Sequence, residues 1–309
     1  MVGSKKLCVI GSLNMDLVAT VQQFPKPGET ITGKAFGTYP GGKGANQAVA
    51  AARLGANTRM VGKVGNDMYG DQYIDTLKQE GIKYDTVGIE PDTSSGIAII
   101  EVDSIGENHI VIIPGANDKV DRDFIDSKWD NIVQGDIFLF QLEIPLDTVI
   151  YSIKKLKEAG KTIILDPAPA RDLPHEIYPY LDYITPNETE TEFLTKRKIH
   201  SQEDLKSAVD VLLDKGIGTV IAKAGRNGAF IISKEKFIHV PGFTVDVMDT
   251  TAAGDSFNAG FAYAFSRGKD LEDCVKMANG VAALSTTAKG AQEAMPTLDQ
   301  VEAFIKKQG

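Results

Sequence analysis

Short apolar runs alternate with amphipathic segments along most of the chain. The runs at Leu7–Ile10 and 60–64 are typical of buried strands, and from residue 45 to 52 the apolar positions recur at helical spacing. After residue 118, helical patterns such as 146–158 and 203–214 separate further strand-like runs at Ile137–Phe140, Thr162–Leu165, Tyr183–Ile184 and 219–222. This alternation predicts an α/β fold in which helices cover a mostly parallel β-sheet.

Two segments depart from this alternation. In residues 96–114, two apolar runs flank the polar stretch 104–108, which predicts a β-hairpin. Together with the turn-rich stretch 16–38, this hairpin could form a small sheet standing apart from the main body. No linker rich in Pro, Gly or Ser divides the chain, so we expect a single domain over residues 1–309.

The composition narrows the classes of partner. The chain has 33 Lys and Arg against 42 Asp and Glu, a formal net charge of −9. This charge disfavours nonspecific binding to nucleic acid or to an anionic membrane. Cys8 and Cys274 are far apart and read as buried thiols in a reducing cytosol, and the four histidines have no metal-ligand spacing. No signal peptide or membrane-spanning stretch is evident, so a cytoplasmic location is expected.

The strongest local motif is the segment 249–257, Asp-Thr-Thr-Ala-Ala-Gly-Asp-Ser-Phe. Its small residues precede an amphipathic helix, so backbone N–H groups at the helix N-terminus can point outward and bind an anion. Asp255 lies in the first turn. It is either a carboxylate favoured by the helix dipole or a base that accepts a proton from an attacking hydroxyl. In both cases, the helix end is expected to keep the pKa of Asp255 low.

A second motif is Gly-Gly-Lys-Gly-Ala-Asn-Gln at residues 41–47. Its first two glycines permit a tight turn, Lys43 supplies a cation, and Asn46 offers a donor and an acceptor. The alternative is a helix start with a solvated lysine. Asn14 and Asp16 follow the first strand, where ligands bind in open α/β sheets, although an Asn-x-Asp pair is also ordinary turn chemistry.

Other nucleotide-binding signatures are absent from the sequence. It contains no G-x-x-x-x-G-K-[ST], no G-x-G-x-x-G, and neither of the protein-kinase motifs H-R-D and D-F-G. The residues alone therefore predict an anion-binding helix end with an adjacent aspartate.

The two motifs, in this order and at this separation, resemble those of the ribokinase-like, or phosphofructokinase-B, family of carbohydrate kinases. The resemblance runs from Leu7 to the C-terminus. It implies a central, mostly parallel sheet with helices on both faces and a small β lid, here about 14–40 and 95–117, that often forms a dimer contact. It also implies transfer of the ATP γ-phosphoryl group to the 5-hydroxyl of D-ribose.

The resemblance assigns roles residue by residue. Asp255 matches the catalytic base, and the backbone amides of Ala252, Ala253 and Gly254 match the anion hole. The matched sugar contacts are Asn14, Asp16, Gly42, Lys43, Asn46, Glu143 and Asp255. The matched nucleotide contacts are Asn187, Lys223, Gly225, Gly228, Gly254 and Asn279.

The same resemblance also implies two metal ions. Glu190 matches a residue that organises Mg²⁺ through water, although Asn187 and Glu190 also read as a helix capping box. The K⁺ loop of the family matches Asp249, Thr251, Ser285, Ala288 and Gly290. Lys223 stands where many family members carry Thr or Ser, and its side chain could reach a phosphate or point to solvent.

Several other functions remain open at this stage. The acceptor could be deoxyribose, another pentose or a nucleoside, although Asn14 and Asp16 favour a sugar rich in hydroxyls. A non-catalytic sensor of sugar or nucleotide could use the same fold. A nicotinamide oxidoreductase is disfavoured by the missing dinucleotide fingerprint.

Overall fold

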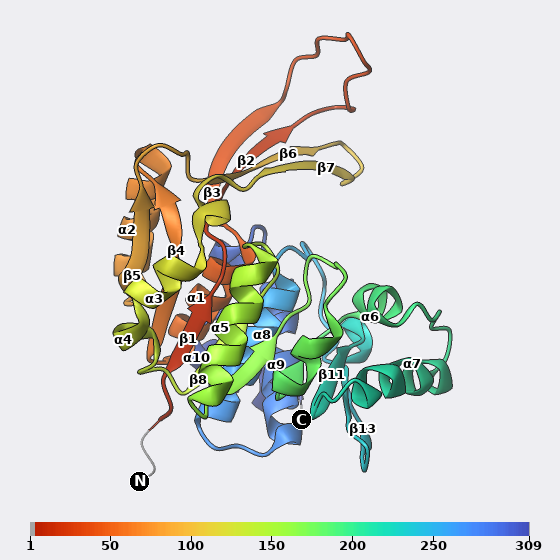
Figure 1. Cartoon of the computed structure of the whole chain (residues 1–309). Helices are drawn as coiled ribbons and strands as arrows, with labels where there is room; N and C mark the ends of the chain where they lie inside the picture. The colour runs from red at the N-terminus through yellow and green to blue at the C-terminus, as the bar shows by residue number, and fades with distance from the viewer. Residues whose placement is uncertain (1–3, 309) are drawn as a thin grey trace.

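A nine-stranded β-sheet forms the body of the molecule (Figure 1). The structure is a computed structural model and describes residues 4–308. Seven adjacent strands of this sheet, β5, β4, β1, β8, β9, β10 and β11, pair in parallel, while β12 and β13 complete the sheet as an antiparallel hairpin. In spatial order the strands are β13 (Phe237–Val240), β12 (Ala229–Ile232), β11 (Thr219–Lys223), β10 (Tyr183–Ile184), β9 (Thr162–Leu165), β8 (Ile137–Phe140), β1 (Leu7–Ile10), β4 (Thr58–Gly65) and β5 (Lys83–Glu90).

The central strands are apolar throughout because both of their faces are covered. All four residues of β1 are buried, and they alternate between two cores. Cys8 and Ile10 pack on one side of the sheet, while Leu7 and Val9 pack on the other. A strand buried on both faces has no polar side, which explains the uninterrupted apolar runs in the sequence.

Helices cover both faces, as the sequence predicted (Figure 1). Helices α1 (Lys43–Arg53), α2 (Met68–Gln79), α8 (Ala253–Ser266) and α9 (Leu271–Ser285) contribute to the core on the side of Leu7. Helices α3 (Arg122–Ser127), α4 (Trp129–Ile132), α5 (Leu146–Glu158), α6 (Glu188–Thr195) and α7 (Gln202–Asp214) contribute to the core on the other side. Helix α10 (Leu298–Gln308) packs against α9.

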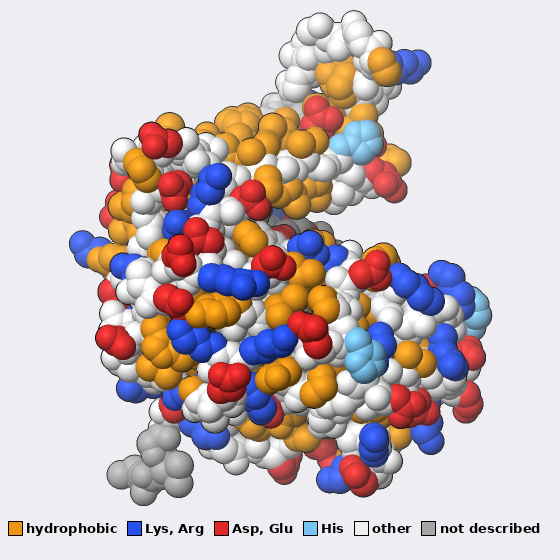
Figure 2. Space-filling view, in the orientation of Figure 1, with side chains coloured by type: hydrophobic (Ala, Val, Ile, Leu, Met, Phe, Trp, Pro, Cys, Tyr) orange, Lys and Arg blue, Asp and Glu red, His pale blue; other side chains and the backbone are white. Residues whose placement is uncertain are grey.

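A smaller four-stranded sheet, the lid, stands away from the body (Figure 1). Its spatial order is β3 (Ala35–Gly41), β2 (Asn14–Thr20), β6 (Gly96–Val102) and β7 (Asn108–Ile113). The predicted hairpin is confirmed, because β6 and β7 pair antiparallel. Every residue of β7 is exposed, and Figure 2 shows hydrophobic side chains gathered on the lid above the body.

Three strands were not predicted from the sequence. Strand β5 lies at the sheet edge and has few buried residues, so its pattern lacks an apolar run. Strands β12 and β13 form an antiparallel hairpin with no helix between them, so they fall outside the alternation of strands and helices on which the prediction was based. Cys8 and Cys274 are buried, as expected. Within residues 4–308, no helix is long and apolar enough to cross a membrane.

Candidate active site

A cavity of about 1100 Å³ opens where strands β9 to β11 end and helix α8 begins. This is the carboxyl edge of the parallel strands, where α/β proteins bind ligands. The wall of the cavity includes many of the residues singled out in the sequence: Lys43, Asn187, Glu190, Lys223, Gly225, Gly228, Ala252, Ala253, Gly254, Asp255 and Asn279.

The N-terminus of α8 lies at the cavity wall without a side-chain cap. Ala252 occupies the N-cap position in a left-handed conformation, with φ of 56°. Among the residues that the structure describes, the backbone N–H groups of Gly254 and Asp255 have no protein acceptor. Free donors and the positive end of the helix dipole make this end of α8 suited to bind an anion.

Asp255 lies in the first turn of α8 and is only 4% exposed. Its carboxylate accepts hydrogen bonds from Asn46 Nδ2 at 3.0 Å and from Gln47 Nε2 at 3.1 Å. Burial raises the pKa of Asp255 to about 6, against the lowering effect of Lys43 and with a smaller raising effect from Asp166. The expectation that the pKa of Asp255 is low is therefore wrong, because loss of hydration outweighs the lowering effects of Lys43, Asn46 and Gln47.

Helix α1 carries the second motif to the same place. Gly42 has φ of 86°, and a Cβ there would lie 2.7 Å from the backbone nitrogen of Asn14, so only glycine fits this turn. The next residue, Lys43, is partly buried at the cavity wall instead of being solvated. Asp255 raises the pKa of Lys43 most, which keeps its side chain a cation despite burial.

The predicted sugar contacts lie beside this cavity, next to Asp255 and Lys43. Glu143 Oε2 accepts hydrogen bonds from Ser12 Oγ at 2.6 Å and from the backbone nitrogen of Lys43 at 3.0 Å. Asn14 Oδ1 accepts from Asn117 Nδ2 at 2.7 Å. The cavity lining itself does not include Asn14, Asp16, Gly42, Asn46 or Glu143.

Asp16 is the second carboxyl group with an unusual pKa in this region. Burial raises the pKa of Asp16 to about 7, and the charges of Glu143, Glu293 and Asp255 add to the effect. A carboxyl group with this pKa is present in both protonation states near neutral pH. It can therefore donate or accept a hydrogen bond.

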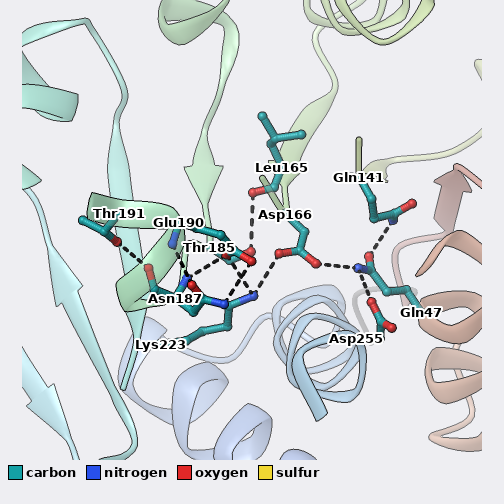
Figure 3. A network of polar contacts seen from close by, with 10 residues as sticks. All are labelled: Gln47, Gln141, Leu165, Asp166, Thr185, Asn187, Glu190, Thr191, Lys223 and Asp255. Carbon is teal, nitrogen blue, oxygen red and sulfur yellow. Dashed lines mark hydrogen bonds and ion pairs between the residues drawn. The ribbon is translucent and has the colours of Figure 1, made fainter. Parts of the chain in front are cut away.

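Three polar residues missed in the sequence complete the site: Asp166, Gln47 and Gln141 (Figure 3). Gln47 Nε2 donates to Asp166 Oδ2 at 3.1 Å as well as to Asp255, and Gln141 Nε2 donates to Gln47 Oε1 at 2.7 Å. Asp166 directly follows strand β9, at the sheet edge where ligands bind. That position was the one signal in the sequence that could have identified it.

Lys223 points into the site, so the alternative that it faces solvent is wrong. Its side chain is 11% exposed, and Nζ lies 2.9 Å from Asp166 Oδ1 and 4.0 Å from Glu190 Oε2. Burial acts to lower the pKa of Lys223, but Asp166 and Glu190 outweigh it, so the pKa is raised and the side chain remains an ammonium ion.

Asn187 and Glu190 form the predicted capping box at the start of α6. Asn187 Oδ1 accepts from the backbone nitrogen of Glu190, and Glu190 Oε2 accepts from that of Asn187, both at 2.8 Å. Burial raises the pKa of Glu190, although Lys223 opposes this effect. Elsewhere on the cavity wall, Asn279 Nδ2 donates to the carbonyl oxygens of Val240 and Pro241.

The two segments of the predicted K⁺ loop lie together next to α8. Asp249 Oδ1 accepts from the nitrogen and the hydroxyl of Thr251, and Asp249 Oδ2 accepts from the nitrogen of Gly290 at 2.9 Å. The backbone nitrogen of Asp249 donates to the carbonyl of Thr286, between Ser285 and Ala288. Over residues 4–308, no three His, Cys, Asp or Glu side chains are grouped to hold a metal ion.

The fold and the site together define an enzyme that transfers a phosphoryl group. An anion-binding helix end beside a buried carboxylate, at the carboxyl edge of a parallel sheet, is suited to that chemistry. Residues 4–298 match the pfkB family of carbohydrate kinases, and the chain belongs to this family.

Relatives and solved structures agree with this assignment. Ribokinases of Bacillus subtilis and Haemophilus influenzae are 43% and 40% identical to the chain, over 97% and 98% of it and 99% of each relative. A deoxyribokinase of Salmonella typhi is 38% identical, over 97% of this chain and 98% of its own length.

Two solved structures superimpose on nearly the whole chain, each covering 98% of this chain and 99% of its own. They are a ribokinase of Thermotoga maritima, with a TM-score of 0.91 and 40% identity, and an Arabidopsis thaliana ribokinase complexed with ribose and ATP, with 0.92 and 34%. The chain is therefore a kinase with a ribokinase-like fold.

The raised pKa of Asp255 predicts a specific dependence of stability on pH. The folded protein holds the Asp255 proton up to pH about 6, whereas the unfolded chain releases it near 4. The free energy of unfolding of the wild type should therefore fall as the pH rises through this window. The fall should be about 3 kcal/mol relative to Asp255→Asn, which cannot titrate.

Urea denaturation of both proteins at several pH values between 4 and 7 measures this difference. Other buried carboxyl groups are common to the two proteins and largely cancel. A difference that stays constant across this window would show that burial does not raise the pKa of Asp255.

Proposed function

We propose that this protein phosphorylates the 5-hydroxyl of D-ribose with ATP, giving D-ribose 5-phosphate and ADP. The observation that carries the proposal is the position of Asp255. Its carboxylate lies at the uncapped end of α8, on the wall of the large cavity, and is also bonded to Asn46 of the glycine motif. It thus stands between a phosphate site and a set of polar groups suited to a sugar.

Asp255 is the proposed catalytic base. It accepts the proton of the attacking hydroxyl as the new bond to phosphorus forms, while the backbone amides of Ala252 and Gly254 stabilise charge on the transferring group. The third predicted amide, that of Ala253, already donates to the carbonyl of Thr250 at 3.2 Å. A pKa of about 6 leaves Asp255 mostly ionised at pH 7 and makes it a stronger base than an ordinary aspartate. Asp255 must be deprotonated to act, so activity should decline as the pH falls below this value.

The polar groups beside Asp255 are the proposed sugar contacts: Asn14, Asp16, Gly42, Lys43, Asn46 and Glu143. Buried charges and amides of this kind match an acceptor that is rich in hydroxyl groups. The base of a nucleoside would need an apolar surface there. An Arabidopsis ribokinase of the same fold was solved with ribose and ATP, which supports both substrates.

ATP is proposed to occupy the large cavity. Asn187, Lys223 and Gly254 lie on the wall near α8 and would contact phosphates, while Gly225, Gly228 and Asn279 lie on the wall formed by the η3 turn (Gly225–Asn227) and α9. A cavity of about 1100 Å³ has room for a nucleotide.

Two metal ions belong to the proposal. The Glu190 carboxylate is buried at the cavity wall, and each of its oxygens can accept a further hydrogen bond, which fits a water of a Mg²⁺ ion carried by the nucleotide. The ion would neutralise charge on the phosphates. The adjoining loops of Asp249, Thr251, Ser285, Ala288 and Gly290 offer carbonyl and hydroxyl oxygens, a donor set that suits K⁺.

Replacing Asp255 by Asn tests the catalytic base. The variant keeps the size of the side chain but cannot accept the proton, so kcat should fall about 10²- to 10⁴-fold while the fold and ATP binding persist. Coupled ADP release and calorimetric titration of ATP measure the two effects. Asp210→Asn removes an exposed carboxylate on α7 and serves as the control. A variant that retains most of its turnover would rule out Asp255 as the base.

The acceptor is tested by ADP release with ribose, 2-deoxyribose and adenosine. The proposal expects the highest kcat/KM for ribose, because the polar pocket would leave buried groups unpaired around an acceptor that lacks a hydroxyl. Exchange of K⁺ for Na⁺ in the same assay should lower the rate. Comparable kcat/KM for adenosine would overturn the choice of a sugar, and ribose binding without ADP release would favour a sensor.

The lid is also proposed to join two copies of the chain. Ile99, Ile110, Val111 and Ile112 are 44–60% exposed on neighbouring lid strands, and association would remove this surface from water. Sedimentation velocity should therefore give a dimer for the wild type and a monomer for Val111→Lys. Ile89→Lys, which changes an equally exposed residue on β5, is the matched control. A wild-type protein that sediments as a monomer would refute the dimer.

A further inference from the structure

A chain of buried hydrogen bonds joins Asp255 to Lys223 through residues that the proposed function does not use (Figure 3). It runs from Asp255 to Gln47, then to Asp166, then to the Lys223 ammonium. Gln47 is fully buried and Asp166 is 2% exposed. The polar atoms in this chain therefore find their hydrogen-bond partners mainly in one another.

The chemistry of the groups determines how Gln47 is oriented. Gln47 Nε2 donates to both Asp166 and Asp255, so the end of Gln47 that faces the two carboxyl groups is its NH₂ group. Each N–H then serves one carboxylate. The carbonyl end of Gln47 accepts from Gln141 Nε2 at 2.7 Å, which locks this orientation. Gln47 thus spaces the two carboxylates without adding a charge.

On its other side, Asp166 holds Lys223 against the anion-binding end of α8. Lys223 Nζ lies 2.9 Å from Asp166 Oδ1 and 3.5 Å from where a Cβ would stand on Gly254. A lysine ammonium has three N–H donors, and Asp166 is the one hydrogen-bond acceptor of Nζ among the described residues. Two donors therefore remain for a phosphate at the α8 terminus.

From this arrangement we propose that Asp166 is a positioning residue for phosphoryl transfer. It holds the Lys223 ammonium beside the anion-binding end of α8 and, through Gln47, fixes the Asp255 carboxylate on the acceptor side of the same point. The Asp166 side chain thereby sets the distance between the Asp255 carboxylate and the Lys223 ammonium, which would contact the transferred phosphoryl group. The inference rests on the proposed function, because it takes this end of α8 as the point of transfer.

An ion pair that only stabilises the fold and one that positions catalytic groups differ in how activity responds when both partners are replaced. Removal of one partner leaves the other as an uncompensated buried charge, whereas removal of both relieves that penalty. Stability should therefore return in the double variant in either case. Activity should return only if the pair is structural, because the double variant still lacks the Lys223 cation.

The test compares the wild type with Asp166→Asn, Lys223→Met and the double variant. Each single variant should lower kcat about 100-fold, because a displaced base or a lost donor costs that much, and should lower Tm by several degrees. In the double variant Tm should recover most of the way while kcat stays about 100-fold below the wild type. Recovery of kcat together with Tm would overturn the proposal.

The link through Gln47 is tested separately by Gln47→Leu. This variant cuts the connection to Asp255 and keeps the Asp166–Lys223 pair, so kcat should fall at least tenfold while the Kd of ADP, measured by calorimetry, stays unchanged. Lys223→Met should instead weaken ADP binding. An unchanged kcat in Gln47→Leu would refute the role of Asp166 toward the base.

A matched pair outside the site provides the control. Lys63 and Glu90 form a partly buried ion pair of 3.0 Å between β4 and β5. Lys63→Met should lower Tm but leave kcat within twofold of the wild type. All rates use ribose, or whichever sugar the wild type phosphorylates. A different acceptor would therefore overturn the proposed substrate and leave the test of Asp166 intact.

Discussion

The burial of several charges at one sheet edge is the constraint on which the rest of the site depends. Asp166, Glu190 and Asp255 are buried carboxylates, and Lys43 and Lys223 are the ammonium groups that compensate them. Buried ions are tolerated only when they are paired and hydrogen-bonded, so each of these groups has its place determined by the others. Gln47 and Asn46 add neutral N–H donors to Asp166 and Asp255, so these carboxylates are hydrogen-bonded without a further buried cation.

This constraint explains why the fold brings the two sequence motifs together. Helix α1 begins at Lys43 and α8 at Ala253, and the two helices pack side by side on one face of the sheet. Asn46 and Gln47 on α1 therefore reach Asp255 on α8. The turn at Gly42 joins lid strand β3 to α1, so the lid is connected directly to the helix whose residues contact Asp255.

The raised pKa values of Asp16 and Asp255 follow from the same crowding. Loss of hydration is the largest cause in both, and neighbouring carboxylates add to it. Ionising these buried carboxyl groups costs the folded protein part of its stability, and this cost is what raises their pKa values. Carboxyl groups with shifted pKa values are typical of functional sites, which agrees with a site for charged ligands at this edge of the sheet.

The sequence by itself determined the strands and helices with strong periodicity, the capping box of Asn187 and Glu190, and the start of α8 among small residues. All of these depend on residues close along the chain. Only the tertiary structure decided the contacts of Asp166, the direction of Lys223 and the pKa of Asp255. Gln47 is 119 residues from Asp166 and 208 from Asp255. Desolvation and pairing at such separations come from packing, which no local pattern records.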